Sequence, residues 1–360
     1  MDDFRRRFLS GGAASAALSV LNACAGPLNM NSTTKVPAPR LDELYARTNL
    51  MCFGRYAVEL PSEAEQIMGP QEIAGGFKLF SRKDFMNPQQ LLESQWKKER
   101  SQLFREPEMI TGIENGPVQN AMHFWYYRYE HAKREDRRWL DGAIAIDSRL
   151  YLYEGMTARS VNLSADELFQ RMTDLMRGMR AWDGKSVPRE PGVCIEGAFI
   201  HEPTYRFQEI MSSGFAFPSM PDVHFSVMSN KDASTEGDNG KGLLERVDEA
   251  RSEQIFYPYT FLRRGKRTLH GLWDGEEVLA RRTDGTLEFD WEMVGETGNV
   301  ARPPWFEMGL RTRVADNEVG AARSSAISDE QAVALWDRLL EGVKFRVAVP
   351  GATAASVALG

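Results

Sequence analysis

The chain has 360 residues, with 44 lysines and arginines against 51 aspartates and glutamates, so its formal net charge is −7. This acidic balance argues against binding to nucleic acid or to anionic lipid headgroups through a basic surface. A hydrophobic content of 42% with 10% aromatic residues is ample for a packed core and excludes a mainly disordered chain. The length suits about two domains.

Residues 1–23 have the pattern of an export signal peptide. Three adjacent arginines are followed by a short segment rich in Gly, Ala and Leu. The apolar part is about half of the ~20 residues that a membrane-spanning helix needs, so a retained anchor helix is disfavoured. The basic start also resembles the twin-arginine export motif, carried here by Arg5, Arg6, Phe8 and Leu9.

The end of this segment predicts a lipid anchor. Leu21-Asn22-Ala23-Cys24 resembles a lipobox, in which the signal peptide is removed before an acylated cysteine. No Asp follows Cys24, and by resemblance to sorted bacterial lipoproteins we expect the periplasmic (inner) leaflet of the outer membrane. Residues 24–40 are rich in Pro, Asn, Ser and Thr and are expected to form a flexible tether.

The first folded unit is expected over residues 41–183. An apolar run that starts at Cys52 and is closed by Pro61 predicts a strand. A helix is expected from Asn87-Pro88 to Leu103, because proline is favoured in a first turn. Further strands are expected over residues 122–130, 142–146 and 150–153, and a helix after Ser164.

The second unit is expected over residues 190–347. It opens with another apolar run, from Cys194 to a closing Pro203. Strands are expected over residues 222–228, 255–260, 268–273, 276–281 and 286–292. Trp273-Asp274-Gly275-Glu276 predicts a hairpin turn, a helix follows Ser328, and residues 348–360 are expected to be a disordered tail.

The two units share a plan that indicates a duplication. Each opens with a cysteine nine residues before a proline, and each ends with a capping-box helix that starts at Ser164 or Ser328. Fourteen residues after each serine stands a glycine, Gly178 or Gly342, and the apolar positions between coincide at helical spacing. The predicted fold class is α+β, an antiparallel sheet with packed helices in each of two similar domains.

Signals of catalysis are sparse. The sequence has no G-x-S-x-G elbow, no phosphate-binding glycine loop, no C-x-x-C, and five scattered histidines, so no cofactor or metal is expected. Asp222 with His224, or Glu276 with Glu277, are conceivable acid–base groups, but strand alternation favours a solvated face for them. We therefore expect a protein that is not an enzyme. Part of the aromatic run 124–127 is a conceivable binding patch, although core packing is favoured for most of it.

Two cysteines remain if Cys24 carries lipid. Cys52 and Cys194 hold equivalent positions in the two units, so in an oxidising periplasm they are a candidate disulfide that would join the units. The alternative is two separate buried thiols.

Several short motifs in order resemble one family. The strand Cys52–Tyr56, the second cysteine strand at Cys194, and the stretches Gly271–Glu277, Phe289–Glu292 and Leu335–Asp337 are similar to the immunity lipoproteins of type VI secretion systems. The resemblance is to the group that neutralises the fourth class of lipase effectors, and it covers residues 48 to 347.

The resemblance implies a periplasmic protein that binds and blocks a cognate phospholipase effector, with two domains arranged as a two-lobed claw. It implies the effector and the membrane as partners, through the lipid on Cys24, and it names no interface residues. Two other functions stay open from the residues alone. One is a periplasmic lipoprotein that acts as an envelope adaptor or ligand-binding protein, and the other is an unrecognised hydrolase.

Overall fold

The computed structural model describes most of the chain after the expected tether. Its described residues are 40–74, 77–81, 87–102, 107–157, 163–252, 259–283, 285–312 and 327–360. The residues predicted to direct export and lipidation, Arg5, Arg6, Phe8, Leu9 and Cys24, lie outside these ranges.

The structure confirms the α+β class, but its two compact units are not consecutive in sequence. Unit 1 combines the chain up to Pro70 with Ile210–Gly360, and unit 2 is Gln71–Glu209. This division differs from the expected units 41–183 and 190–347, because the strands that follow the tether pair with strands from the end of the chain. The two-lobed claw stays a prediction.

Unit 1 is built on a seven-stranded sheet, in which the strand pairs from β15 across to β13 are antiparallel. In β17, Phe289 and Trp291 are fully buried, while Glu288, Asp290 and Glu292 alternate with them, which is the two-residue alternation of a sheet with two different faces. In order across the sheet the strands are β15 (Tyr259–Leu269), β16 (Trp273–Arg282), β17 (Leu287–Met293), β18 (Trp305–Arg311), β14 (Met220–Asn230), β13 (Glu209–Phe217) and β3 (Glu65–Ile73).

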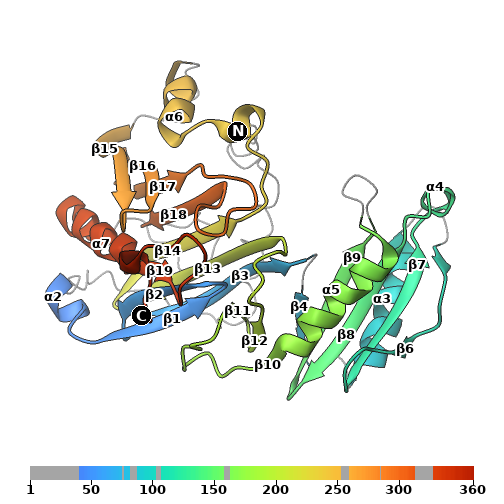
Figure 1. The fold of residues 1–360 in the computed structure, drawn as a ribbon. Coiled ribbons are helices and arrows are strands. Elements are labelled where there is room, and N and C mark those ends of the chain that lie inside the picture. Colours follow the sequence, from blue (N-terminus) through green and yellow to red (C-terminus); the bar gives the residue numbers. More distant parts are fainter. Residues whose placement is uncertain are drawn as a thin grey trace, which may run out of the picture. The chain divides into compact units, whose positions relative to one another are not determined.

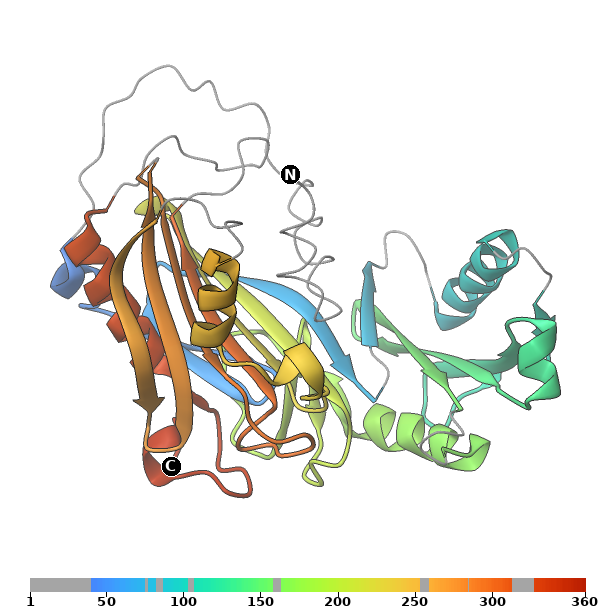
Figure 2. The same cartoon turned by 90° about the horizontal axis from the view of Figure 1, so that it is seen from above.

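Helices cover both faces of this sheet (Figures 1 and 2). α7 (Asp329–Gly342) packs on the inner, apolar face, and α6 (Leu243–Ser252) packs on the outer face against β16 and β17. The unit also contains a three-stranded sheet, β1 (Thr48–Phe53), β2 (Tyr56–Pro61) and β19 (Val343–Phe345). The remaining elements are the short helices α2 (Leu41–Leu44), η3 (Gly237–Gly240) and η4 (Ala354–Ser356).

Unit 2 holds a second antiparallel sheet between two helices, α3 (Pro88–Gln102) and α5 (Ala165–Gly178), which lie on opposite faces in Figure 2. The expected helix after Asn87 is thus confirmed. The sheet runs β4 (Phe77–Ser81), β9 (Arg149–Met156), β8 (Trp139–Ile146), β7 (Ala121–Tyr127) and β5 (Glu108–Met109), with β6 (Glu114–Asn115) also on β7 and α4 (Glu130–Arg134) after it. A three-stranded sheet completes the unit, with β10 (Met179–Ala181), β12 (Ala198–His201) and β11 (Gly192–Ile195).

The elements predicted to be duplicated are present, but they are not combined as expected: the cysteine hairpin of each predicted unit pairs with the third strand that follows the helix of the other unit. The hairpin that contains Cys52 receives its third strand, β19, from α7 at the end of the chain, and the Cys194 hairpin receives β10 from α5. We call these sets module 1 (β1, β2, α7, β19) and module 2 (β11, β12, α5, β10). Both serines form the expected capping boxes, Ser164 with Glu167 and Ser328 with Gln331.

The two modules share one hydrogen-bonding register. Val343 of β19 pairs with Val58, six residues after Cys52, and Met179 of β10 pairs with Ile200, six residues after Cys194. The two modules therefore present the same side chains to the same face of each three-stranded sheet, because a one-residue slip would turn every side chain to the other face. That the two halves of the chain are copies of one unit stays a prediction.

Each predicted cysteine strand is in fact a tight hairpin. Phe53 pairs with Tyr56 and Ile195 with Ala198, so a two-residue turn interrupts each apolar run. Gly54 (φ 51°) and Gly197 (φ 72°) occupy these turns in the left-handed region that glycine adopts at little cost.

Two further local expectations were wrong. The hairpin turn lies at His270 and Gly271, both with positive φ, and not at residues 273–276. Gly275 is needed for packing, since a Cβ there would lie 2.3 Å from the Trp291 ring. Residues 348–360 are not a disordered tail, because Ala358 and Leu359 donate backbone hydrogen bonds to Phe345 and Arg346 and follow the edge of β19.

Candidate functional site

The adjacent glutamates of β16, Glu276 and Glu277, lie on opposite faces of the seven-stranded sheet. Glu276 accepts a hydrogen bond at 2.8 Å from the backbone N–H of Leu244 in α6. Glu277 is buried on the opposite face and accepts from the indole N–H of Trp336 in α7 at 3.3 Å. Carboxylates held on opposite faces of a strand cannot share one substrate, so the acid–base reading of this pair has no geometric support.

Asp222 and His224 lie on one face of β14, as alternation requires. Burial lowers the pKa of His224 below its usual value, although the carboxylate of Asp222 opposes this effect. Among the described residues Nε2 of His224 has no hydrogen-bond partner, so that nitrogen activates no nucleophile there.

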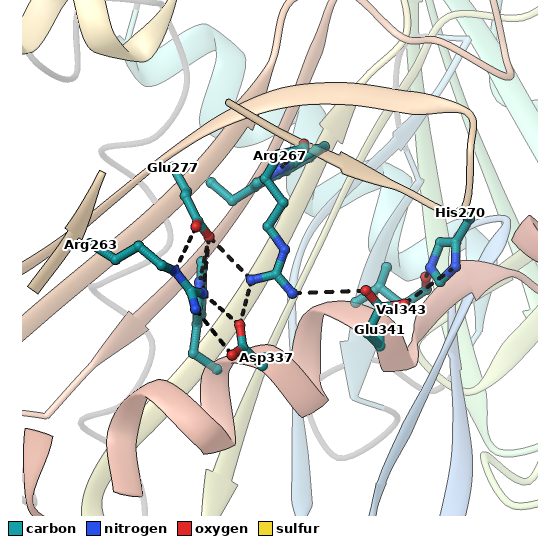
Figure 3. Close-up of polar contacts among 9 residues, drawn as sticks. Arg263, Arg267, His270, Glu277, Asp337, Glu341 and Val343 are labelled. Carbon is teal, nitrogen blue, oxygen red and sulfur yellow. Dashed lines mark hydrogen bonds and ion pairs between the residues drawn. The ribbon is translucent and has the colours of Figure 1, made fainter. Parts of the chain in front are cut away.

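An ion-pair network fixes α7 to the inner face of β15 and β16 (Figure 3). Glu277 lies 2.6 Å from Nε of Arg263 and 3.2 Å from Nη1 of Arg267. Asp337 of α7 accepts hydrogen bonds from the same two guanidinium groups. Burial opposes ionisation of Asp337, but these bonds hold its pKa below the usual value. We call Arg263, Arg267, Glu277 and Asp337 the inner network, in which two cations offset two carboxylates.

His270 continues this contact toward module 1 (Figure 3). Its Nε2 lies 2.8 Å from the carbonyl oxygen of Val343 in β19, and its Nδ1 lies 3.8 Å from the carboxylate of Glu341. Burial is the largest influence on its pKa and lowers it, so the ring is neutral at pH 7 and donates its Nε2–H to the carbonyl. The ring therefore ties the β15–β16 turn to the repeated strand.

The outer face of the same sheet carries a line of glutamates. Glu276, Glu292 and Glu307 are direct cross-strand neighbours on β16, β17 and β18, and we call them the outer row. Arg246 of α6 donates a hydrogen bond to Glu292, and the indole of Trp305 donates to Glu307 at 2.9 Å. Like charges directly opposite one another destabilise a sheet, so this arrangement is costly unless a proton or a cation offsets it.

Burial raises the pKa of Glu307 to about 7, and the negative charge of Glu292 adds to the rise. Burial likewise raises the pKa of Glu292, although Arg246 opposes it. Asp290, two residues before Glu292, shows the same upward direction from burial against the opposing charge of Arg311. The outer row thus carries a carboxyl group that exchanges its proton near neutral pH.

The aromatic run of β7 divides between two environments. Phe124 and Tyr126 are buried in the core of unit 2 beside α3, whereas Trp125 and Tyr127 are half-buried on the other face. Tyr127 donates a hydrogen bond at 2.7 Å to the carboxylate of Asp136.

Cys52 and Cys194 are both disulfide-bonded and almost completely buried. A disulfide is therefore confirmed, and the alternative of two separate thiols is wrong. That these two cysteines pair with each other stays a prediction.

Two kinds of site are absent from the described part of the chain. No group of three or more His, Cys, Asp or Glu side chains there is arranged to hold a metal ion. No helix there is long and apolar enough to cross a membrane.

Neither the inner network nor the outer row was predicted from the sequence. The inner network joins β15 and β16 to Asp337 of α7, which lies about seventy positions after Arg263 and Arg267, and nothing in a single sequence pairs them. The outer face had a local signal, since Glu288, Asp290 and Glu292 alternate with apolar residues in one strand.

The fold, with its two compact units of antiparallel sheets and packed helices, is that of known immunity proteins. The apo structure of the immunity protein TplEi of the T6SS from Pseudomonas aeruginosa matches with a TM-score of 0.63 and 24% identity, covering 83% of this chain and 97% of that one. The crystal structure of the Tle4–Tli4 complex matches with a TM-score of 0.64 and 24% identity, over 83% of this chain and 97% of that one. TplEi complexed with "L" peptide, also from Pseudomonas aeruginosa, matches with a TM-score of 0.60 and 22% identity, over 83% and 98%.

Residues 186–348 match the family model described as the Tle cognate immunity protein 4 C-terminal domain. The family is one of immunity proteins, a role that is not enzymatic. A search of curated proteins gave no match.

Proposed function

We propose that this protein is an immunity protein that binds a cognate secreted phospholipase effector in the periplasm and blocks it. The observation that carries the proposal is the family match of residues 186–348, which include the Cys194 hairpin and nearly all of the seven-stranded sheet. The likeness in fold to the immunity protein in the Tle4–Tli4 complex supports it over most of the chain.

The proposal includes a location. The lipobox that ends at Cys24 and the basic start of the chain support export and a lipid anchor on the periplasmic leaflet of the outer membrane. A tethered inhibitor has a raised effective concentration at the surface that a phospholipase attacks. Blocking needs no catalytic groups, since a protein that covers the approach to the lipase active site excludes its lipid substrate. The grip of two domains as a claw is part of the same proposal.

Protection of living cells is the direct test. Cells that lack this gene are mixed with sister cells that deliver the cognate lipase, and survivors are counted with and without a plasmid copy. We expect survival to fall on deletion and to return with the plasmid. Equal survival of deleted and complemented cells would contradict the immunity function.

A second test uses purified components. The chain from residue 25 onward, added in increasing amounts to the lipase, should form a complex at one to one and suppress phospholipid hydrolysis as that complex fills. If phospholipid hydrolysis continues when all of the lipase is in the complex, the protein binds the lipase without inhibiting it, which would contradict the blocking role.

The anchor is tested separately with Cys24→Ser, which removes the acylated thiol. We expect loss of metabolic labelling by a fatty acid and release into the soluble periplasmic fraction, while the purified protein still binds the lipase. A Cys24→Ser protein that stays in the membrane fraction would show that another segment holds it there.

A further inference from the structure

A row of large apolar side chains crosses the unit 2 sheet at the end where α4 follows β7 (Figure 1). Tyr126 of β7, Trp139 of β8 and Met156 of β9 are successive cross-strand neighbours, so they lie on one face. Trp96 of α3 covers Tyr126. Trp139 is half-buried, and Met156 is 38% exposed. Neighbouring apolar side chains that stay accessible in this way are typical of interaction sites.

A tyrosine and two arginines border this row. Tyr129 meets the Trp139 ring edge-on, with the ring centroids 5.6 Å apart. The guanidinium group of Arg128 lies 5.9 Å from the centroid of the Trp139 ring. Arg137 donates a hydrogen bond at 3.4 Å to the hydroxyl of Tyr129. We call Arg128, Tyr129, Arg137, Trp139 and Met156 the aromatic patch.

The two arginines of the aromatic patch are held in place by carboxylates. Glu99 of α3 accepts hydrogen bonds at 2.9 Å from both Nε and Nη2 of Arg128. Glu135 accepts a hydrogen bond at 3.0 Å from Nη2 of Arg137. A side chain already held in one conformation loses little entropy when a partner binds. The aromatic patch is therefore preorganised for binding.

The guanidinium groups lie nearer the solvent than the carboxylates that hold them. The side chain of Arg128 is 39% exposed and that of Glu99 is 11% exposed. The side chain of Arg137 is 39% exposed, against 31% for Glu135. Among the described residues, Nη1 of Arg128 has no hydrogen-bond partner. The aromatic patch thus offers N–H donors beside an apolar centre, and a carboxylate is the group that complements a guanidinium.

The surroundings of the aromatic patch carry both signs of charge. Asp141 and Glu154 form the next cross-strand pair on the same face. Three more cations near α4 each form an ion pair: Lys133 with Glu108, Arg134 with Glu130, and Arg138 with Asp136.

This balance of charge distinguishes between two kinds of partner. An anionic membrane surface attracts segments with an excess of lysine and arginine, which the surroundings of the aromatic patch do not have. A protein interface instead combines an apolar centre, rich in Trp, Tyr, Met and Arg, with a polar rim of both charges. The aromatic patch has this composition, so the complementary surface belongs to a protein.

We propose that the aromatic patch is a docking surface for the phospholipase effector, which places an apolar side chain over Trp139 and Met156 and a carboxylate beside Arg128. The proposal rests on the proposed function. It adds the part of unit 2 that contacts the effector and the chemistry that the effector presents there.

Binding of the purified protein to the purified lipase tests the docking surface. Trp139→Ala removes the central ring and should weaken binding by about 30-fold or more, as loss of an interface hot spot does. Met156→Asp adds an unpaired charge to the apolar contact and should also weaken binding by about tenfold or more. Because Met156 is exposed, this second variant keeps the test valid if Trp139→Ala does not fold. Circular dichroism melting curves check the folding of each variant.

Ile110→Asp is the matched control for Met156→Asp. Ile110 is also 38% exposed in unit 2, but it follows β5, three strand spacings or about 14 Å across the sheet from β9. We expect it to bind the lipase with wild-type affinity.

A second pair of variants tests the charge. Arg137→Met keeps most of the side-chain stem and should slow association with the lipase and reduce its dependence on salt. Arg206→Met is its control, because Arg206 is also an ion-paired cation of unit 2 that lies over an aromatic ring, that of Phe207. The control should associate at the wild-type rate.

The outcomes separate this proposal from the immunity function. If the wild type binds the lipase and the folded Met156→Asp variant binds it equally well, the docking surface is overturned and the immunity function stands. If the wild type does not bind the lipase, both are overturned. Sedimentation with vesicles of phosphatidylethanolamine and phosphatidylglycerol should show no binding by the protein without its lipid. Vesicle binding that Met156→Asp abolishes would assign the aromatic patch to the membrane and overturn the proposal.

Discussion

Modules 1 and 2 present the same backbone in two different packing environments. Their hairpins, third strands and capping boxes have matching register and spacing. In module 2 the helix faces a sheet through methionines, and a Cβ on Gly142 of β8 would lie 2.4 Å from the sulfur of Met172. In module 1 the corresponding position of the helix is Trp336, beside the buried carboxylate of Glu277.

This difference separates the features of each module that its own residues determine from those that the neighbouring sheet determines. The helix cap, the closing glycine and the strand register depend on contacts inside each module, and they are the same in both. The face of each helix that packs on a large sheet depends on that sheet. There α5 packs methionines on β8, whereas α7 adds the inner network to the packing of Trp336 on Phe225 and Phe289.

The largest expected effect tests whether the equivalent cysteines of the two modules are joined. Non-reducing peptide mapping should find one cross-linked peptide that contains Cys52 and Cys194. Cys52→Ser with Cys194→Ser should lower the free energy of unfolding by up to about 4–5 kcal/mol, because the bond closes a very long loop in the unfolded chain. A map in which these cysteines are in different cross-links would break the symmetry between the modules.

The next prediction compares the contacts that hold α7 and α5 on their sheets. Glu277→Ala should cost about 3 kcal/mol in urea unfolding, because it leaves Arg263 and Arg267 without their buried counter-charge. Met172→Ala should cost about 2–3 kcal/mol through the cavity it leaves. High salt should reduce the first cost and leave the second unchanged, and equal salt dependence would contradict the distinction. Asp274→Asn, at an exposed position of the same strand as Glu277, is the control.

Substitution of the glycines that end α5 and α7, Gly178 and Gly342, should have smaller and similar effects on stability. A Cβ at Gly178 would lie 2.4 Å from the carbonyl oxygen of His201, and one at Gly342 would lie 2.8 Å from that of Glu59, the equivalent strand position. Alanine at either site should therefore destabilise by about 1–3 kcal/mol through overpacking, although alanine normally favours a helix. Gly112→Ala, where nothing lies within 4 Å, should have little effect in the same thermal unfolding series. A stabilised Gly178→Ala or Gly342→Ala would refute the close approach.

The smallest effects concern the caps. Ser164→Ala and Ser328→Ala each remove a side-chain acceptor for the third residue of a helix, at 3.2 Å in both. Each should cost about 1 kcal/mol, and the two costs should agree. Ser101→Ala, at an exposed hydroxyl near the end of α3, is the comparison for loss of a serine outside a cap. Costs that differ by more than twofold would show that the caps are not equivalent.

A single sequence does not predict most of the candidate site. The capping boxes, the closing glycines, the disulfide cysteines and the α+β class were predicted, because each depends on neighbours within a few residues or on composition. The two-residue turns inside the cysteine runs were missed, since a glycine among apolar residues is compatible with both a strand and a turn. The inner network and the outer row were missed because cross-strand neighbours follow from register, which a sequence specifies only once the pairing strands are known.

The sequence by itself determined the local pieces: two extended apolar runs that start at Cys52 and Cys194, two capped amphipathic helices, and a start that predicts export and a lipid anchor. The tertiary structure decided how the pieces are joined. The Cys52 hairpin is completed by the end of the chain, and the Cys194 hairpin by the helix just before it. The physical reason is that the two hairpin edges pair with their third strands in the same register, so backbone hydrogen bonding does not choose between the two strands. Loop closure distinguishes them weakly, at about 0.6 kcal/mol per doubling of loop length, so the packing of each helix on its own sheet makes the choice.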